Sequence, residues 1–226
     1  MARIVILVSG QGRGTNMEAI IRACQSGIIP HSGVVLVIGT RSEAPALQKA
    51  EQLGVPTAVV SPREFPDDEA YGDALLWVLQ RVQPDLICLA GYMRLLPARV
   101  VRAYPARIMN IHPALLPQFG GKGMYGLRVH EVVLQSGASQ TGCTVHFVDE
   151  QYDTGPIILQ RTVPVLEGDT PEILAQRLLP VEHATYVEAV RRFVEGEIPL
   201  SGVPIADSSG SECGSYGQPP DAGSGG

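Results

Sequence analysis

Short apolar runs alternate along this chain with longer stretches in which apolar residues recur every three or four positions. Short runs are typical of β-strands and the longer pattern of amphipathic helices, and their alternation indicates βαβ units around a parallel sheet. Leu86 to Ala90 is apolar throughout, as expected of a central strand that is covered on both faces. The runs predict strands at residues 3–8, 33–38, 57–60, 86–90, 108–111, 141–147 and 157–164.

The periodic stretches predict helices at residues 16–26, 44–53, 68–82, 97–103, 126–136 and 171–196. Pro180 lies inside the last of these, so that helix is expected to kink or split. Two β-rich runs joined by a turn lie between Gln140 and Pro164, so one strand is expected to run antiparallel. The pattern predicts an α/β fold with a doubly wound, mostly parallel twisted sheet of about seven strands (residue ranges above) and flanking helices.

The chain has 226 residues, enough for one domain with a sizeable core. We expect residues 1–206 to form this domain. Residues 207–226 consist mainly of Ser, Gly, Pro and Asp, which predicts a disordered tail. The apolar run in residues 1–10 is too short to span a membrane and lacks the layout of a signal peptide, so no membrane partner and a cytoplasmic location are expected.

The net charge is −6, which argues against a nucleic-acid partner because such proteins usually carry a basic face. Any anion-binding site must therefore be local. The four cysteines show no paired spacing, and three of them lie in apolar runs. They are expected to be reduced thiols in the core, and no metal site is predicted.

Two polar side chains lie at the end of a predicted strand in the segment Asn110-Ile111-His112-Pro113. Residues two apart on a strand point to the same side, so Asn110 and His112 are expected to emerge together. An amide donor beside an imidazole can stabilise a developing oxyanion and transfer a proton. The pair predicts acyl-transfer chemistry, and simple strand-end hydrogen bonding is the alternative.

A glycine-rich turn leads from the first strand into a helix, with residues 9–16 reading Ser-Gly-Gln-Gly-Arg-Gly-Thr-Asn. Backbone N–H groups in such a turn bind anions, and Thr15 or Asn16 is expected to cap the helix. Thr15 stands where a dinucleotide fingerprint needs glycine, and no P-loop lysine follows. A monophosphate site is predicted, with a tight strand-to-helix turn as the alternative.

Residues 149–156 read Asp-Glu-Gln-Tyr-Asp-Thr-Gly-Pro, a turn-forming acidic loop between two strands. One of its carboxylates is expected to raise the pKa of His112 above roughly 6.5 and keep the imidazole cationic near neutrality. Asp153 is preferred because the following Thr-Gly-Pro fixes it next to a strand end; a solvated hairpin loop is the alternative. The other histidines of interest are expected to be surface or strand residues: His31, His130 and His146.

Together these motifs resemble those of the folate-dependent formyltransferase family, and specifically of phosphoribosylglycinamide formyltransferases. The resemblance runs from Arg3 to about Gly196 and includes, in the same order, residues 90–94, 144–149 and 182–184. It implies a Rossmann-like fold. It also implies transfer of the formyl group of 10-formyltetrahydrofolate, a co-substrate, to the amine of 5′-phosphoribosylglycinamide in purine biosynthesis.

The resemblance implies roles for individual residues. The catalytic residues of the family match Asn110, His112 and Asp153. The ribonucleotide is expected at the phosphate-side loop and at an acidic residue of the last helix, which match Gly14, Thr15, Asn16 and Glu182. Folate contacts are implied for Met93, Arg94, Leu95, Leu96, Asn110, Asp149 and Asp153. The partners are small molecules, and a homodimer is left open.

Three segments depart from the family pattern. Gln11-Gly12 looks like an insertion in the phosphate-side loop. Asp68 stands where the family commonly has a folate-contacting arginine, with Arg63 a few residues earlier. The segment Gly120–Tyr125 is longer than in many relatives, and the sequence assigns it no role.

Three other functions compete with this interpretation. Methionyl-tRNA formyltransferases share similar motifs but add a C-terminal RNA-binding domain, whereas only about thirty residues follow the last predicted helix here. Formyltetrahydrofolate hydrolases add an N-terminal regulatory domain before the catalytic strand. A nucleotide-binding module without chemistry would place Arg41 against a 2′-phosphate. The transferase is the expected function.

Overall fold

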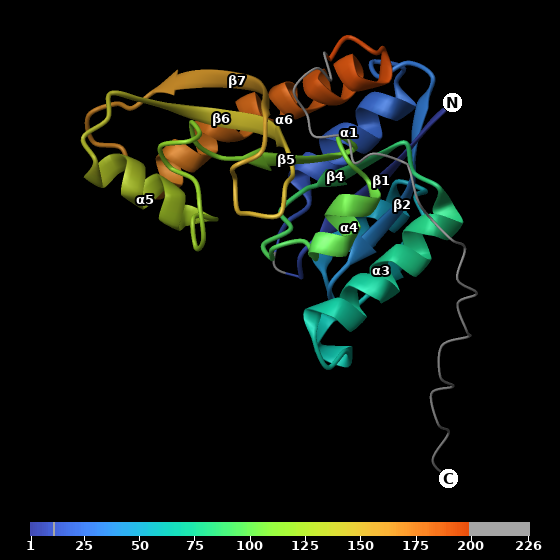
Figure 1. The fold of residues 1–226 in the computed structure, drawn as a ribbon. Coiled ribbons are helices and arrows are strands. Elements are labelled where there is room, and N and C mark those ends of the chain that lie inside the picture. The colour runs from blue at the N-terminus through green and yellow to red at the C-terminus, as the bar shows by residue number, and fades with distance from the viewer. Residues whose placement is uncertain (11, 199–226) are drawn as a thin grey trace.

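The computed structural model describes residues 1–10 and 12–198, which form a seven-stranded sheet between two layers of helices (Figure 1). The strand order is β3-β2-β1-β4-β5-β6-β7. Gln11 and the predicted tail at 207–226 lie outside the described residues. The strands are β1 (Ala2–Val8), β2 (Ser32–Gly39), β3 (Thr57–Val59), β4 (Leu86–Leu89), β5 (Ile108–His112), β6 (Gln140–Phe147) and β7 (Ile157–Pro164).

One strand of the sheet runs against the others. Strands β1 to β5 pair in parallel, whereas β6 pairs antiparallel with both β5 and β7. The expectation of one antiparallel strand between Gln140 and Pro164 is confirmed. The strand order reverses between β1 and β4, as in doubly wound folds, so the predicted fold class is also confirmed.

The helices lie close to their predicted positions, although a short 3₁₀ turn, η1, was not predicted. Its first residue is Pro62, whose fixed φ suits the start of a helical turn. The helical elements are α1 (Thr15–Gln25), α2 (Pro45–Gln52), η1 (Pro62–Glu64), α3 (Asp68–Val82), α4 (Ala98–Ala103), α5 (Leu127–Gln135) and α6 (Pro171–Val194).

Helix α6 continues through Pro180 as one unbroken element, so the expected split was wrong. Pro180 removes the N–H that would bond to the carbonyl of Gln176. The buried residues Leu174, Leu178 and Tyr186 on both sides of it pack into the same core, which favours one continuous helix. None of the helices that the structure describes is both long and apolar enough to cross a membrane.

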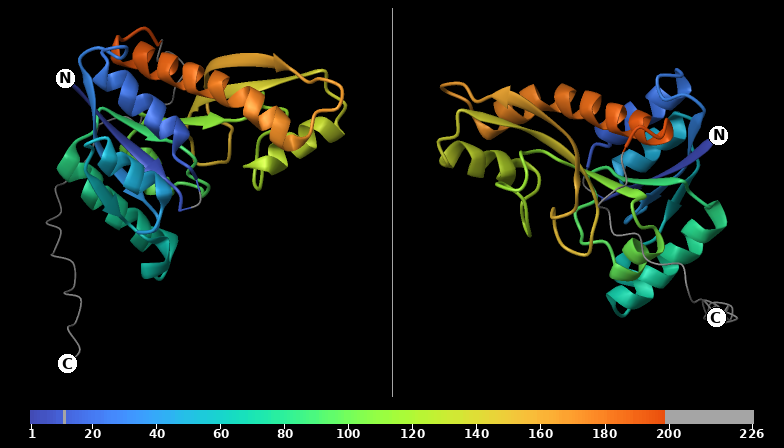
Figure 2. Two further views of the ribbon diagram at one scale, coloured as in Figure 1. Left: turned by 180° about the vertical axis from the view of Figure 1, so that it is seen from behind. Right: turned by 45° about the horizontal axis from the view of Figure 1, so that its top comes forward.

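Alternate residues of β1 face two separate cores, which explains why the central strands are apolar throughout. Ile4, Ile6 and Val8 face a core formed with α1, α2, α5 and α6, whereas Val5 and Leu7 face a core formed with α3 and α4. The two helical layers lie on opposite faces of the sheet in both views of Figure 2. The strand ends therefore meet solvent only at the edges, where the loops can form a site.

Tyr186 fastens α6 to the centre of the sheet. Its hydroxyl lies 3.1 Å from the carbonyl oxygen of Leu89 on β4 and 2.9 Å from that of Met109 on β5. The side chain is fully buried, so no solvent replaces these bonds. One hydroxyl proton thus holds together two strands that carry site residues.

We expect Tyr186→Phe to lower the free energy of unfolding by about 1–3 kcal/mol, because two buried carbonyls lose their donor. For a chain of this size each kcal/mol corresponds to roughly 2–4 °C in melting temperature, which calorimetry measures. Tyr104→Phe is the control, since Tyr104 is also buried but has no bond to its hydroxyl in the described part of the chain. Equal melting temperatures for the two variants would contradict this role of Tyr186.

Candidate active site

A cavity of about 420 Å³ opens beyond the ends of β4 and β5 and beside α1. Its volume is within the range of small-molecule sites, and its position beside the reversal of strand order is where doubly wound sheets bind ligands. The walls come from the loop after β4, the glycine-rich segment 121–126 and the loop between β6 and β7. Most of the predicted site residues line it: Asn16, Met93, Arg94, Leu95, Leu96, Asn110, His112, Asp153 and Glu182.

Three predicted residues lie outside this lining. Gly14 and Thr15 form the turn into α1, with Gly14 at the N-cap position in the left-handed conformation (φ 68°). A Cβ at Gly14 would lie 2.8 Å from the Cβ of Ala46, so glycine is required there. Neither Thr15 nor Asn16 caps the helix, so that expectation was wrong. Asp149 accepts hydrogen bonds from the Thr154 hydroxyl and the Gln151 N–H, which fold the loop.

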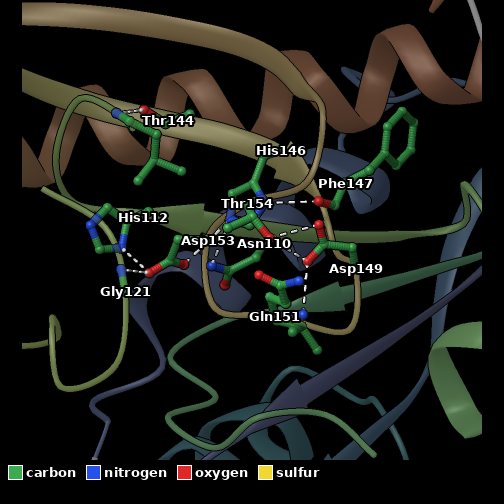
Figure 3. A network of polar contacts seen from close by, with 12 residues as sticks. Asn110, His112, Gly121, Thr144, His146, Phe147, Asp149, Gln151, Asp153 and Thr154 are labelled. Carbon is green, nitrogen blue, oxygen red and sulfur yellow. Dashed lines mark hydrogen bonds and ion pairs between the residues drawn. The ribbon is translucent and has the colours of Figure 1, made fainter. Parts of the chain in front are cut away.

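Asp153 lies between two imidazole rings (Figure 3). Its Oδ2 is 3.6 Å from Nδ1 of His112, and its Oδ1 is 3.6 Å from Nε2 of His146. The backbone N–H of Gly121 also donates to Oδ2, at 3.0 Å. Asp153 has a φ of 57°, a left-handed conformation that aspartate tolerates better than most residues. The loop thus turns the carboxylate inward instead of leaving it in solvent.

His112 is held from both sides of its ring. Its Nε2 is 2.7 Å from the carbonyl oxygen of Phe119, which assigns the Nε2 proton in the neutral ring and turns Nδ1 toward Asp153. Burial lowers the pKa of His112, and the charge of Asp153 and the Phe119 carbonyl oppose this only in part. The expected raised pKa was therefore wrong, because desolvation outweighs the nearby carboxylate.

For the carboxyl of Asp153, in contrast, the polar neighbours affect the pKa more strongly than burial does. Burial favours its protonated form, but the neighbouring imidazoles of His146 and His112 and the Gly121 N–H outweigh burial and lower its pKa. Asp153 therefore carries a negative charge at neutral pH. The resting site combines a neutral His112 with a charged Asp153.

His146 is a site residue that the sequence did not identify, because a strand histidine is usually structural. It is 2% exposed, lines the cavity and lies opposite Asn110 in the β5–β6 register. Its Nδ1 is 2.8 Å from the carbonyl oxygen of Phe147, which leaves Nε2 free to accept from the Asn110 amide at 3.2 Å. A signal for His146 was present in the sequence: the spacing Thr144-x-His146 on one predicted strand repeats the spacing Asn110-x-His112 on another. His130 is also buried rather than on the surface.

Asn16 and Glu182 form the other end of the cavity. The Asn16 amide donates to Oε2 of Glu182 at 2.9 Å. Burial raises the pKa of Glu182, and the bond from Asn16 opposes this shift. Oδ1 of Asn16 is buried and has no partner among the described residues, so it can accept a hydrogen bond from a group bound in the cavity.

The loop after β4 is tied to its neighbours through backbone N–H groups. Met93 donates to the hydroxyl of Ser9 at 2.7 Å, and Leu95 donates to the hydroxyl of Tyr152 at 3.1 Å. Tyr152 comes from the β6–β7 loop, so the two opposite walls of the cavity are joined. Asp68, where the motif resemblance led us to expect an arginine, forms an ion pair with Arg94 at 2.9 Å.

In residues 1–10 and 12–198, no three His, Cys, Asp or Glu side chains come together as metal ligands would. The polar side chains that line the cavity are amides, imidazoles, carboxylates, tyrosines and the cations of Arg94 and Lys122. These groups are suited to hydrogen bonding and proton transfer.

Comparison with known proteins identifies the family. A model of the formyl transferase family matches residues 2–190. The chain belongs to this family. The resemblance inferred from the motifs is thereby confirmed.

Individual relatives agree with this assignment. The chain is 42% identical over 206 residues to the chloroplastic phosphoribosylglycinamide formyltransferase of Arabidopsis thaliana, covering 90% of this chain and 70% of that protein. Glycinamide ribonucleotide transformylase 1 of Symbiobacterium toebii is 46% identical, with a TM-score of 0.83 over 90% of this chain and 92% of the other. A formyltetrahydrofolate deformylase of Pseudomonas syringae is 25% identical, with a TM-score of 0.74 over 86% of this chain and 62% of its own.

We expect His112 to titrate below its ordinary value of 6.5 in the unliganded protein, since burial disfavours the imidazolium. Asp153→Asn should lower this pKa further, because it removes the negative charge that favours the protonated ring. Proton–nitrogen correlation spectra of labelled histidines across a pH series measure both values. Glu150→Gln, at an exposed carboxylate of the same loop, is the matched control, and a His112 pKa above 6.5 or insensitive to Asp153→Asn would contradict the electrostatic picture.

Proposed function

We propose that this protein transfers the formyl group of 10-formyltetrahydrofolate to the amine of 5′-phosphoribosylglycinamide. The observation that supports this most strongly is the convergence of Asn110, His112 and Asp153 on one cavity. The two ends of this cavity are lined by different chemical groups. The folate is proposed to bind beside Met93 to Leu96, with Asp153 in the opposite wall and Asp149 folding the loop behind it, and the ribonucleotide beside Asn16 and Glu182.

Asn110 is proposed to stabilise the oxyanion that forms when the amine attacks the formyl carbon. One of its amide protons is directed to His146, which fixes the orientation of the amide. The second amide proton is then available to the formyl oxygen. A pre-oriented donor of this kind contributes about 2.7–4 kcal/mol in comparable sites.

His112 is proposed to move the proton that the amine must lose. The neutral ring keeps its Nε2 proton on the Phe119 carbonyl, so Nδ1 is the basic atom. When Nδ1 takes the proton, the imidazolium forms beside the charged Asp153 and is stabilised by it. The same proton can then pass to the departing nitrogen of the folate, so no covalent enzyme intermediate is needed.

Glu182 and Asn16 are proposed to hold the ribose, with the turn at Gly14 and Thr15 placing backbone N–H groups near the phosphate. The unsatisfied Oδ1 of Asn16 supports this, because a ribose hydroxyl can donate to it. The N-terminus of α1, a helix of 11 residues, adds a favourable dipole for an anion.

We further propose residues 1–206 as the catalytic domain and the cytoplasm as its location. Cys24, Cys88 and Cys143 are free thiols, which is typical of a reducing compartment.

Formyl-folate hydrolysis is the competing function, since a deformylase shares the fold. The polar Asn16–Glu182 end of the cavity favours an amine-bearing ribonucleotide as acceptor over water.

The test measures formyl transfer by the wild-type chain and by two single variants. With both substrates the wild type should release tetrahydrofolate only when the ribonucleotide amine is present. His112→Ala should lower kcat about 10²–10⁴-fold and Asn110→Ala about 10²–10³-fold, with little change in ribonucleotide affinity. The absorbance change of the deformylated folate measures turnover, and calorimetry measures affinity.

His31→Asn is the control, since His31 is exposed and the left-handed backbone there (φ 48°) accepts asparagine. Formate release at the same rate without the amine would identify a hydrolase instead. Near-full turnover in His112→Ala would show that the assigned proton transfer is wrong.

A further inference from the structure

Three polar residues on neighbouring strands lie in one row across the sheet. His112 on β5 faces Thr144 on β6, and Thr144 faces Gln160 on β7. Directly opposed residues of antiparallel strands project from the same face of a sheet. His112 lines the catalytic cavity, whereas Thr144 and Gln160 lie outside its lining. The row therefore connects the imidazole with two polar side chains that no step of the proposed reaction uses.

Thr144 and Gln160 hold the chain segment that follows His112. The Thr144 hydroxyl donates to the carbonyl oxygen of Ala114 at 2.7 Å and accepts from the backbone N–H of Leu116 at 3.1 Å. The Gln160 amide donates to the carbonyl oxygen of Leu116 at 3.0 Å and to the Thr144 hydroxyl at 2.8 Å. The hydroxyl thereby uses its proton and both of its lone pairs. Together these bonds fix the start of the segment against β6 and β7.

The same segment contacts both His112 and Asp153. The carbonyl oxygen of Phe119 accepts from Nε2 of His112 at 2.7 Å. The backbone N–H of Gly121 donates to Oδ2 of Asp153 at 3.0 Å (Figure 3). Phe119 is also joined to the start of the segment, because its N–H donates to the carbonyl oxygen of Leu115 at 3.4 Å. The position of the start therefore affects the contacts of both catalytic residues.

Close packing at Gly120 provides a second connection. A Cβ at Gly120 would lie 2.5 Å from Cδ2 of Leu116 and 3.0 Å from Cβ of Asp153. The backbone of Gly120 thus fills the space between these two side chains. A displacement of Leu116, whose N–H and carbonyl are the groups bound by Thr144 and Gln160, would reach Asp153 through this contact.

We propose that Thr144 and Gln160 are positioning residues for the transfer reaction, which act through residues 113–121 to hold the Phe119 carbonyl on Nε2 of His112. The inference rests on the proposed function and adds to it two residues outside the cavity. With the proton held on Nε2, Nδ1 remains the basic atom. Thr144 is fully buried, whereas Gln160 is exposed on the edge strand, so Thr144 should have the larger effect.

The test compares Gln160→Met, Thr144→Val and Thr144→Ser with the wild type. Methionine and valine keep the size of the side chain but cannot form the bonds to the segment, whereas serine keeps the hydroxyl. The kcat of formyl transfer should fall about three- to tenfold in Gln160→Met and about 10- to 100-fold in Thr144→Val, with KM values changed less than about twofold. Thr144→Ser should retain kcat within about threefold. Gln140→Met, at the exposed start of β6, is the control.

Nitrogen chemical shifts of labelled histidines show which ring nitrogen of His112 carries the proton, and they need no turnover. The wild type should show the Nε2–H tautomer, and Gln160→Met a mixture of both tautomers. Such a mixture supports the inference even if the wild type transfers no formyl group, a result that would refute only the proposed function. An unchanged tautomer in Gln160→Met would overturn the inference, whether or not kcat falls and whether or not Thr144→Val folds.

Discussion

The carboxylate of Asp153, held between His112 and His146, is the interaction on which the rest of the site depends. It is 3.6 Å from each ring, and the Gly121 N–H fixes one of its oxygens. A loop carboxylate would normally stay in solvent, where its charge is best hydrated. The left-handed backbone at Asp153 and the internal bonds of Asp149 turn it inward instead. Its charge is therefore available where an imidazolium must form.

The antiparallel direction of β6 determines which of its residues lie opposite Asn110 and His112. Because β6 runs antiparallel to β5, Asn110 lies opposite His146 and His112 lies opposite Thr144. Four polar side chains thus form two cross-strand pairs at one corner of the sheet. The β6–β7 loop then places Asp153 3.6 Å from both His112 and His146.

The glycine-rich segment 121–126 gains a role from this geometry. It lines the cavity opposite β5, and Gly121 takes part directly by donating to Asp153. The positive φ values of Gly121, Gly123 and Gly126 let the chain follow the cavity wall closely without side chains filling it. The length of this segment, which the sequence left without a role, is thus used to close the site.

The sequence was sufficient where a local pattern determines the structure. The alternation of apolar runs located the strands, and the motif around Asn110 and His112 predicted two residues that line the main cavity. It failed where the outcome depends on long-range packing. The sign of the His112 pKa shift depends on how deeply the ring is buried, which no motif records. The contacts of His146, and those of Thr144 and Gln160 with the segment after His112, depend on strand register and on side chains distant in sequence.

A double-mutant cycle on His112 and Asp153 tests most directly whether the two residues act as one unit. The kcat/KM of formyl transfer would be measured for His112→Gln, Asp153→Asn and the double variant. Because Asp153 is assigned to act through His112, the double variant should lose no more than about the larger single loss. Losses that multiply would mean that the two residues act independently and would contradict this account.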